Sequence, residues 1–179
     1  MRIGELAAAR GIAVTWKPFL LGPVFAAQGW DTSPFNIYPA KGRYMWRDME
    51  RICAARGLPF CRPAVFPQNG LMAARLALAA AEENRLDTFT KAVFQAQFGA
   101  GEDIADESVL RDCLGMAGLD LGLMQRAQAP DIKSALRAQT DEAIAAGIFG
   151  APSFTSGTEL FWGDDRLEQA LDHAVAGAI

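Results

Sequence analysis

The chain has 179 residues, of which 51% are hydrophobic, and its formal net charge is −4. That length allows one domain with a substantial core, or a domain that carries an insertion. No block of basic residues is present, which argues against a nucleic-acid partner, and no apolar run reaches the ~18 residues that a membrane-spanning helix needs.

The cysteines indicate a reducing compartment. Cys53, Cys61 and Cys113 form no CxxC pair, and the first residues contain no apolar core of a secretory signal. We therefore expect a cytoplasmic protein with reduced, mostly packed thiols and no metal site. A reactive thiol is the alternative, but nothing near any cysteine in the sequence would lower its pKa.

The first two predicted elements are a helix and a strand. Residues 2–10 have helical apolar spacing, and Gly11 follows as a C-terminal glycine would. Residues 12–21 then predict a strand, with Val14 and Trp16 on one face. The next segment, 22–42, is rich in glycine and proline and predicts a loop.

A long block of helices follows. Asn69 and Asp106 are plausible N-terminal caps for two of them. The non-helical passage 60–70 interrupts the block. The predicted helices are residues 44–55, 71–84, 86–98, 107–118, 119–130 and 131–147.

The C-terminal part predicts a hairpin and a last helix. A strand near residue 154, a turn at Ser156 and Gly157 and a strand at 159–162 precede a helix that begins at Arg166. The short connection makes the hairpin antiparallel. Strands separated by helices favour a mixed α/β sheet.

Pro152 lies where the last long helix gives way to the hairpin. A trans proline that separates helix from strand is one interpretation, since only about 5–6% of X-Pro bonds in folded proteins are cis. The other interpretation is a cis proline at a strand start, which leaves the backbone of Ala151 free to face a ligand. The order of helix, proline, hairpin and helix favours the cis form.

The pair Asp164 and Asp165 also allows two interpretations. Either aspartate could cap the last helix, which is worth about 1 kcal/mol, and chemistry alone favours this role. Alternatively, a helix start beside a carboxylate suits a ligand that carries both a carboxylate and an ammonium group.

Five separated motifs together resemble the 2-hydroxychromene-2-carboxylate isomerase family. They are WKPFLLGPVF, PAKGRYMWRD, FPQNGLMAAR, GIFGAPSF and LFWGDDRL, in that order along nearly the whole chain. This family is related to the kappa-class glutathione transferases within the DsbA-like thioredoxin group. The resemblance implies an α/β, thioredoxin-like sheet with an all-helical insertion, glutathione as cofactor and a homodimer. Residues 1–38 and 140–179 would form the thioredoxin-like domain, and 39–139 the insertion.

The resemblance also implies which residues would bind glutathione. Ala151 and Pro152 match the positions whose backbone pairs with the cysteinyl part, and Asp164 and Asp165 match those that hold the γ-glutamyl group. Lys41 matches a lysine at the mouth of the site. Kappa-class enzymes have an asparagine that contacts the ligand several residues before this lysine. Thr32 lies near that position and is a weaker match, and Asn36 is out of register with it.

One departure concerns the start of the sequence. Family members begin with a strand and a turn whose serine hydroxyl faces the glutathione sulfur, and both are expected to be missing here. We therefore name no catalytic residue. Either an internal methionine was taken as the start or the chain is truncated, and we expect little isomerase activity from the sequence as it stands. The serines outside the matching context are Ser33, Ser108, Ser134, Ser153 and Ser156.

The implied function is glutathione-dependent isomerisation of a small aromatic keto acid in aromatic compound degradation. The alternatives are a kappa-type glutathione transferase, a thiol-disulfide oxidoreductase of the DsbA family and an inactive glutathione binder. The absence of a CxxC motif argues against the oxidoreductase.

Overall fold

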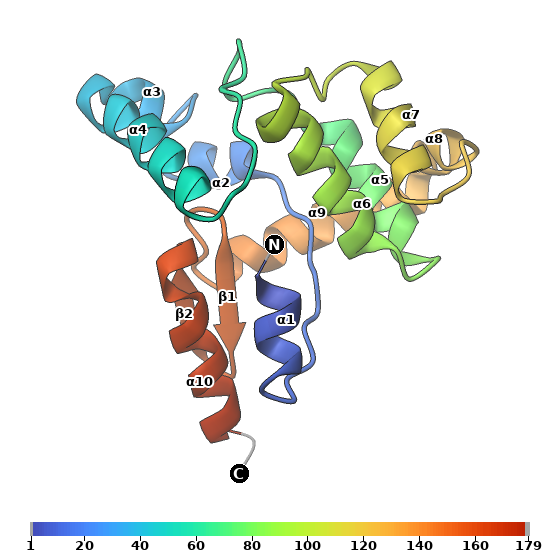
Figure 1. The fold of residues 1–179 in the computed structure, drawn as a ribbon. Coiled ribbons are helices and arrows are strands. Elements are labelled where there is room, and N and C mark those ends of the chain that lie inside the picture. The colour runs from blue at the N-terminus through green and yellow to red at the C-terminus, as the bar shows by residue number, and fades with distance from the viewer. Residues whose placement is uncertain (1, 178–179) are drawn as a thin grey trace.

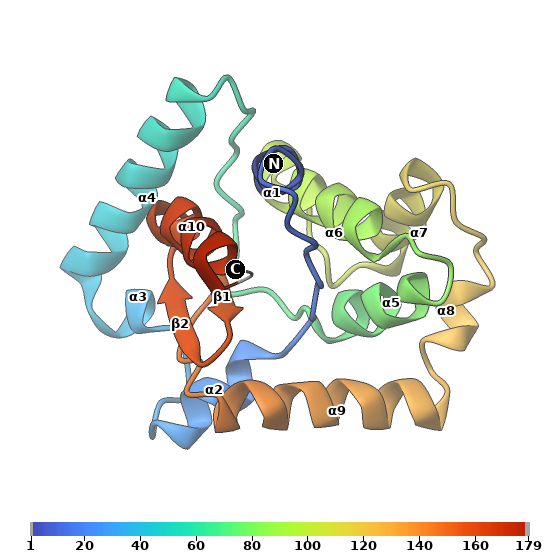
Figure 2. The same ribbon diagram turned by 90° about the horizontal axis from the view of Figure 1, so that it is seen from below.

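Residues 2–177 are described by a computed structural model, in which two groups of packed elements contain the hydrophobic cores and a separate pair of helices within residues 34–55 packs apart from both (Figure 1). The first group is helical and the second is built around a hairpin. Helix α9 (Pro130–Ala145) runs from one group to the other (Figure 2). The helical group contains α5 (Leu71–Ala81), α6 (Leu86–Phe94), the π-helix η1 (Gln95–Ala100), α7 (Glu107–Met116) and α8 (Leu123–Arg126). The hairpin group contains α1 (Ile3–Ala8), β1 (Ser153–Ser156), β2 (Glu159–Trp162), the 3-10 turn η2 (Asp164–Arg166) and α10 (Leu167–Gly177).

The helical group contains the larger hydrophobic core. Leu76, Phe89, Leu110 and Leu114 come from three different helices, and none of them is exposed to solvent. Helix α7 begins where the sequence predicts, because the Asp106 carboxylate accepts a hydrogen bond from the backbone N–H of Ser108 at 2.8 Å. The apolar faces of these helices are therefore buried against one another rather than against a sheet.

The hairpin group has a smaller core. β1 pairs antiparallel with β2, with Ser153 opposite Trp162 and Ser156 opposite Glu159, as the short connection predicts. Helix α10 packs on the hairpin, and α1 packs on α10. Ala7, Leu167 and Leu171 form the centre of this cluster. The hairpin's position is therefore set by the two terminal helices.

The prediction of a strand over residues 12–21 is wrong. Residues 12–20 are extended, but no described backbone hydrogen bond involves residues 13–19, and helix α2 (Leu21–Ala27) begins at Leu21. Val14 and Trp16 are half-buried while Thr15 is exposed, so the predicted alternation of faces is present. A ladder needs a second strand within reach, and the sheet in the described part of the chain consists of β1 and β2 alone.

The prediction of a loop over residues 22–42 is also wrong. Besides α2, the segment contains α3 (Pro34–Ile37) and the start of α4 (Pro39–Ala55). Pro34 and Pro39 each occupy the first turn of a helix, where the missing N–H of proline has no intrahelical partner to lose. These prolines therefore begin helices here instead of interrupting them.

The other predicted boundaries agree with the structure to within a few residues. Gly11 and Gly101 both have positive φ angles at the ends of helices. The Asn69 side chain accepts a hydrogen bond from the N–H of Leu71 at 3.1 Å, beside the start of α5. None of the helices within residues 2–177 is both long and apolar enough to cross a membrane. The division into a thioredoxin-like domain and an insertion at residues 39–139 stays a prediction.

We predict that Leu114→Ala lowers the free energy of unfolding by about 2–5 kcal/mol, because the deletion leaves a cavity in the helical core. The matched control is Met116→Ala on the same helix, where the side chain is 64% exposed and the expected change is within about 0.5 kcal/mol. Urea unfolding of both variants measures the difference. Equal effects at the two positions would contradict the assignment of the α7 core face.

Candidate functional site

The turn before β1 carries the predicted backbone site. The Ala151-Pro152 peptide bond is cis, as the sequence context favours. Ala151 and Pro152 are exposed, and no described hydrogen bond uses the N–H or C=O of Ala151. The turn is held by two hydrogen bonds, from the Ser153 hydroxyl to the carbonyl of Gly150 at 2.8 Å and from the N–H of Gly163 to the carbonyl of Pro152 at 3.0 Å. The backbone of Ala151 is thus presented to solvent on a well-supported turn.

Two exposed aromatic rings lie beside this turn. Phe149 and Trp162 have ring centroids 5.1 Å apart, and each residue is 45% exposed. Gly150 lets the indole approach the backbone, since a Cβ at this position would lie 2.5 Å from Trp162 Nε1. The result is an apolar surface next to the free backbone of Ala151.

Asp164 lies where three distant parts of the chain meet. Its carboxylate accepts a hydrogen bond from Arg56 Nη2 at 2.6 Å and lies 3.4 Å from Arg2 Nη2. Arg2 also donates to the carbonyl of Asp164 at 3.1 Å and to the carboxylate of Glu168 at 2.9 Å. The hydrogen bond from the Arg56 guanidinium, more than the nearby charge of Arg2, holds the pKa of Asp164 below its usual value. Asp164 is therefore a stable anion at neutral pH.

Asp165 is the more open of the two aspartates. Its side chain is 73% exposed, and its carboxylate contacts Arg166 Nη1 at 3.1 Å. Gly163 precedes η2 with a φ of 103°, and a Cβ there would lie 2.5 Å from Asp165 Oδ1. Since neither aspartate side chain accepts a described hydrogen bond from the backbone at this helix start, the capping interpretation is wrong for both.

Thr32 and Lys41 lie apart from this group. The Thr32 hydroxyl accepts a hydrogen bond from Asn36 Nδ2 at 3.1 Å, and the same amide group donates to the carbonyl of Phe66 at 3.0 Å. Lys41 is exposed in the first turn of α4, about 22 Å along the helix from its C-cap residue Arg56. The structure therefore brings together Ala151, Pro152, Asp164 and Asp165 through Gly163, and no described contact joins Thr32 or Lys41 to them.

Sequence reasoning missed Arg2 and Arg56. Arg56 is 108 residues from Asp164, and Arg2 is 162 residues from it. Neither arginine belongs to a quoted motif, and no local pattern marks them. Only the packing of α1 against α10 and the path of the chain after α4 bring their guanidinium groups to Asp164.

Of the five serines that lie outside the matching context of the family, four have hydroxyl groups that already form hydrogen bonds within the protein. These bonds are Ser33 with the N–H of Phe35, Ser108 with Asp106, Ser153 with the carbonyl of Gly150 and Ser156 with His173. They leave none of these four serines as an evident partner for a ligand at Ala151.

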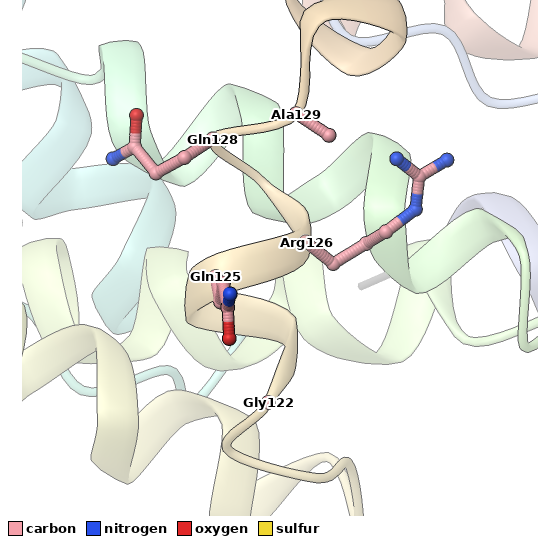
Figure 3. Close-up of a pocket in the computed structure, with 5 residues that line it drawn as sticks. All are labelled: Gly122, Gln125, Arg126, Gln128 and Ala129. Carbon is pink, nitrogen blue, oxygen red and sulfur yellow. The ribbon is translucent and has the colours of Figure 1, made fainter.

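A surface hollow lies elsewhere, around α8 and the start of α9. Its lining residues are Gly122, Gln125, Arg126, Gln128 and Ala129 (Figure 3). The polar side chains in Figure 3 diverge instead of pointing at a common centre, and Arg126 is paired with Glu82 and Asp131. The hollow therefore offers no convergent set of groups for a ligand.

Comparison with known proteins assigns the family. Residues 1–175 match the DSBA-like thioredoxin domain. The chain belongs to this family. The structure also superimposes on a solved structure of selenomethionine 2-hydroxychromene-2-carboxylate isomerase with a TM-score of 0.85 and 24% identity, covering 99% of this chain and 86% of that one. The DsbA-like thioredoxin fold predicted from the motifs is thereby confirmed, although the described chain is mostly helical and its sheet has two strands.

Three curated relatives have similar sequences. The 2-hydroxychromene-2-carboxylate isomerase of Sphingobium xenophagum is 29% identical over 170 residues, which cover 94% of this chain and 86% of the relative. Glutathione S-transferase kappa 2 of Caenorhabditis elegans is 28% identical, covering 89% of this chain and 77% of the relative. Human glutathione S-transferase kappa 1 is 25% identical, covering 85% and 73%. The resemblance to the isomerase and to its kappa-class relatives is thus confirmed.

We predict that Arg56→Gln lowers the free energy of unfolding at pH 7 by up to about 1 kcal/mol, because both partners of the ion pair are partly exposed. The pKa of Asp164 is lowered in the folded state. The ionised carboxylate therefore contributes to the free energy of unfolding above its usual pKa, and this contribution is lost as the pH falls through the lowered pKa. The difference between variant and parent in urea unfolding should therefore shrink below pH 3.8. A difference that grew on acidification would contradict the assignment.

We predict that the cysteines separate by reactivity. Cys61 is exposed, whereas Cys113 is buried, and burial raises the pKa of Cys113 to about 11. At pH 8 a maleimide should label Cys61 in the native protein and Cys113 only after unfolding in urea. Mass spectrometry of peptides from each sample measures the labelled fraction, and native labelling of Cys113 would contradict the packing of α7.

Proposed function

We propose that this protein binds glutathione and catalyses a glutathione-dependent isomerisation of the 2-hydroxychromene-2-carboxylate type. The observation that carries the proposal is the alignment with the Sphingobium xenophagum isomerase, which spans 94% of this chain and 86% of the isomerase. The substrate class would be a small aromatic keto acid. The homodimer that the resemblance implies and the cytoplasmic location that the cysteines indicate stay predictions.

The groups around the Pro152 turn fit glutathione chemically. Ala151 offers a free N–H and C=O, which suit the peptide backbone of a cysteinyl residue. Asp165 offers an open carboxylate for an ammonium group, and Arg56 offers a guanidinium for a carboxylate. The buried Nε of Arg2 has no partner among the described residues, so this cluster also contains an unused donor.

When bound, glutathione supplies a thiolate that adds reversibly to a double bond conjugated with a ketone, which frees that bond to rotate. In this proposal the backbone of Ala151 orients the cysteinyl part, and Asp165 holds the γ-glutamyl end. Phe149 and Trp162 form an exposed apolar surface beside Ala151, on which an aromatic substrate ring can lie. The proposal assigns residues of this chain to the binding of glutathione. It assigns no hydroxyl group to the stabilisation of the glutathione sulfur.

The experiment measures glutathione binding by calorimetry and follows the interconversion of the cis and trans forms of hydroxybenzylidenepyruvate by absorbance. We expect binding, and isomerisation only when glutathione is present, at a rate below that of the Sphingobium xenophagum isomerase measured in parallel. Absence of glutathione binding would refute the proposal. Conjugation of an electrophilic nitroarene without isomerisation would favour the kappa-type transferase, whose relatives align over 89% and 85% of this chain.

Asp165→Ala should weaken glutathione binding about tenfold or more, because loss of a hydrogen bond to a charged group costs about 1.5–3 kcal/mol. Its melting temperature should stay close to that of the parent, since Asp165 caps no backbone group. The matched control is Asp106→Ala, which removes a true cap and should lower stability by about 1 kcal/mol while leaving affinity unchanged. An Asp165→Ala variant with parental affinity would remove this residue from the site.

A further inference from the structure

A second surface hollow lies at the N-terminal end of α5, between α5, the start of α7 and the segment that joins α8 to α9. Its volume is about 160 Å³, and its lining includes Leu71, Met72 and Arg75 of α5 together with Glu107 and Gln128. The three α5 residues belong to the motif FPQNGLMAAR, which has no part in the proposed glutathione site. The chemistry of this hollow is therefore separate from that of the glutathione site.

Arg75 contributes a guanidinium that no described group of the protein binds. Its Nε is buried and has no hydrogen-bond partner, and none of its nitrogens takes part in a described hydrogen bond or ion pair. Arg2 also has a buried Nε without a partner, but its terminal nitrogens bind Glu168 and Asp164. Buried donors in folded proteins are nearly always hydrogen-bonded, so the unpaired Nε of Arg75 beside an open hollow points to acceptor atoms supplied from outside the chain.

The first turn of α5 adds two unpaired backbone donors beside the same hollow. The N–H of Leu71 binds the Asn69 side chain at 3.1 Å. The next two N–H groups, of Met72 and Ala73, have no described partner, because the first N–H groups of a helix have no carbonyl to bind within it. Arg75 lies one helical turn after Leu71 on the same face, and long side chains on a helix point back toward its N-terminus. The guanidinium and the backbone donors are therefore directed at one region, where they attract an anion.

The other lining groups limit the charge and the size of this anion. Glu107 presents a side chain that is 63% exposed and lies 3.6 Å from Arg111 Nη2, and its carboxylate would repel a second negative charge in the hollow. Leu71 and Met72 are half-buried and offer apolar surface, and the Gln128 amide donates to Met72 Sδ at 3.4 Å. The volume is below the ~300 Å³ at which sites for drug-sized ligands begin, so the hollow suits a small monoanion with an apolar body.

We propose that this hollow binds a small monocarboxylate with an apolar body. Arg75 and the N–H groups of Met72 and Ala73 bind the carboxylate, and the side chains of Leu71 and Met72 contact the apolar body. The planar guanidinium can meet both carboxylate oxygens through parallel hydrogen bonds, and its Nε then has the partner that the described chain does not provide. No lining residue of this hollow belongs to the Pro152 turn, so the inference does not depend on the proposed binding of glutathione.

The test titrates four compounds into the parent protein by calorimetry, in the absence of glutathione. Benzoate has a single carboxylate and an apolar ring. Benzamide lacks the charge, acetate lacks the ring, and phenyl phosphate carries a second negative charge at pH 8. We expect benzoate to bind at one saturable site, about tenfold or more tightly than each of the other three, because each of them lacks one feature that the hollow matches.

Substitutions then locate the site. Arg75→Gln should weaken benzoate about tenfold or more and leave the response to glutathione at the parental level. The matched control is Arg137→Gln, at an exposed arginine of α9 that lines neither hollow, and it should change no affinity. Arg75→Lys keeps the charge but loses the planar fork, so its affinity for benzoate should be intermediate. Glu107→Gln should raise the affinity for phenyl phosphate, because the repelling carboxylate is removed. Thermal melts establish that each variant is folded.

The outcomes for benzoate decide the inference whatever the result for glutathione. Absence of saturable benzoate binding to the parent refutes it, as does benzoate binding that Arg75→Gln leaves unchanged. Benzamide binding as tight as that of benzoate also refutes it, since recognition would not involve the charge. A loss of benzoate binding in an Arg75→Gln variant with the parental melting temperature supports it. Because the Glu107 side chain is exposed, Glu107→Gln should fold normally, and an unchanged affinity for phenyl phosphate in that variant would contradict the placement of the site even if Arg75→Gln failed to fold.

Discussion

The carboxylate of Asp164 joins three parts of the chain that no secondary structure connects. Arg2 comes from the start of the first helix, Arg56 from the end of α4, and Asp164 from the turn that leads into α10. Without this anion, Arg2 and Arg56 would lose the carboxylate that they share, and among the described contacts only Arg2 would keep another carboxylate partner, that of Glu168. The open carboxylate of Asp165 lies one residue from this charge balance, and the turn at Ala151 is joined to it by the hydrogen bond from Gly163 to Pro152.

The groups that hold the Pro152 turn in place are different from the groups that remain available to a ligand. The aromatic pair Phe149 and Trp162, the glycine beneath the indole and the bond from Gly163 to Pro152 hold the turn from within. The groups that remain available are a backbone amide and carbonyl, one carboxylate and most of one guanidinium. These are the complements of a peptide with a zwitterionic end, and all of them lie within the hairpin group or contact it.

Local signals predicted the elements that depend on local physics. The cap at Asp106, the turn glycine at 157 and the antiparallel direction of the hairpin follow from neighbouring residues, and each agrees with the structure. The prediction of a strand over residues 12–21 is wrong because alternating burial indicates only that the chain is extended. A β-ladder also requires a second strand within hydrogen-bonding distance, which the local sequence does not show. Pro34 and Pro39 were misjudged because proline both ends and begins helices, and only the following residues decide which. Motifs located Asp164 and Asp165, but Arg2 and Arg56 reach them through tertiary packing alone.

The close approach of Trp162 to Gly150 gives the site an optical signal of its own. Among the four tryptophans, Trp162 is 45% exposed beside Ala151, Trp16 and Trp30 are half-buried, and Trp46 is 8% exposed and packed edge-on against Phe66 at 4.9 Å. Emission from a solvated indole lies at longer wavelength than emission from a buried one, so the red side of the fluorescence spectrum is weighted toward the turn. A ligand that covered this turn would remove water from the Trp162 ring and leave the Trp46 ring buried as before, so its binding would shift the emission of Trp162 to shorter wavelength.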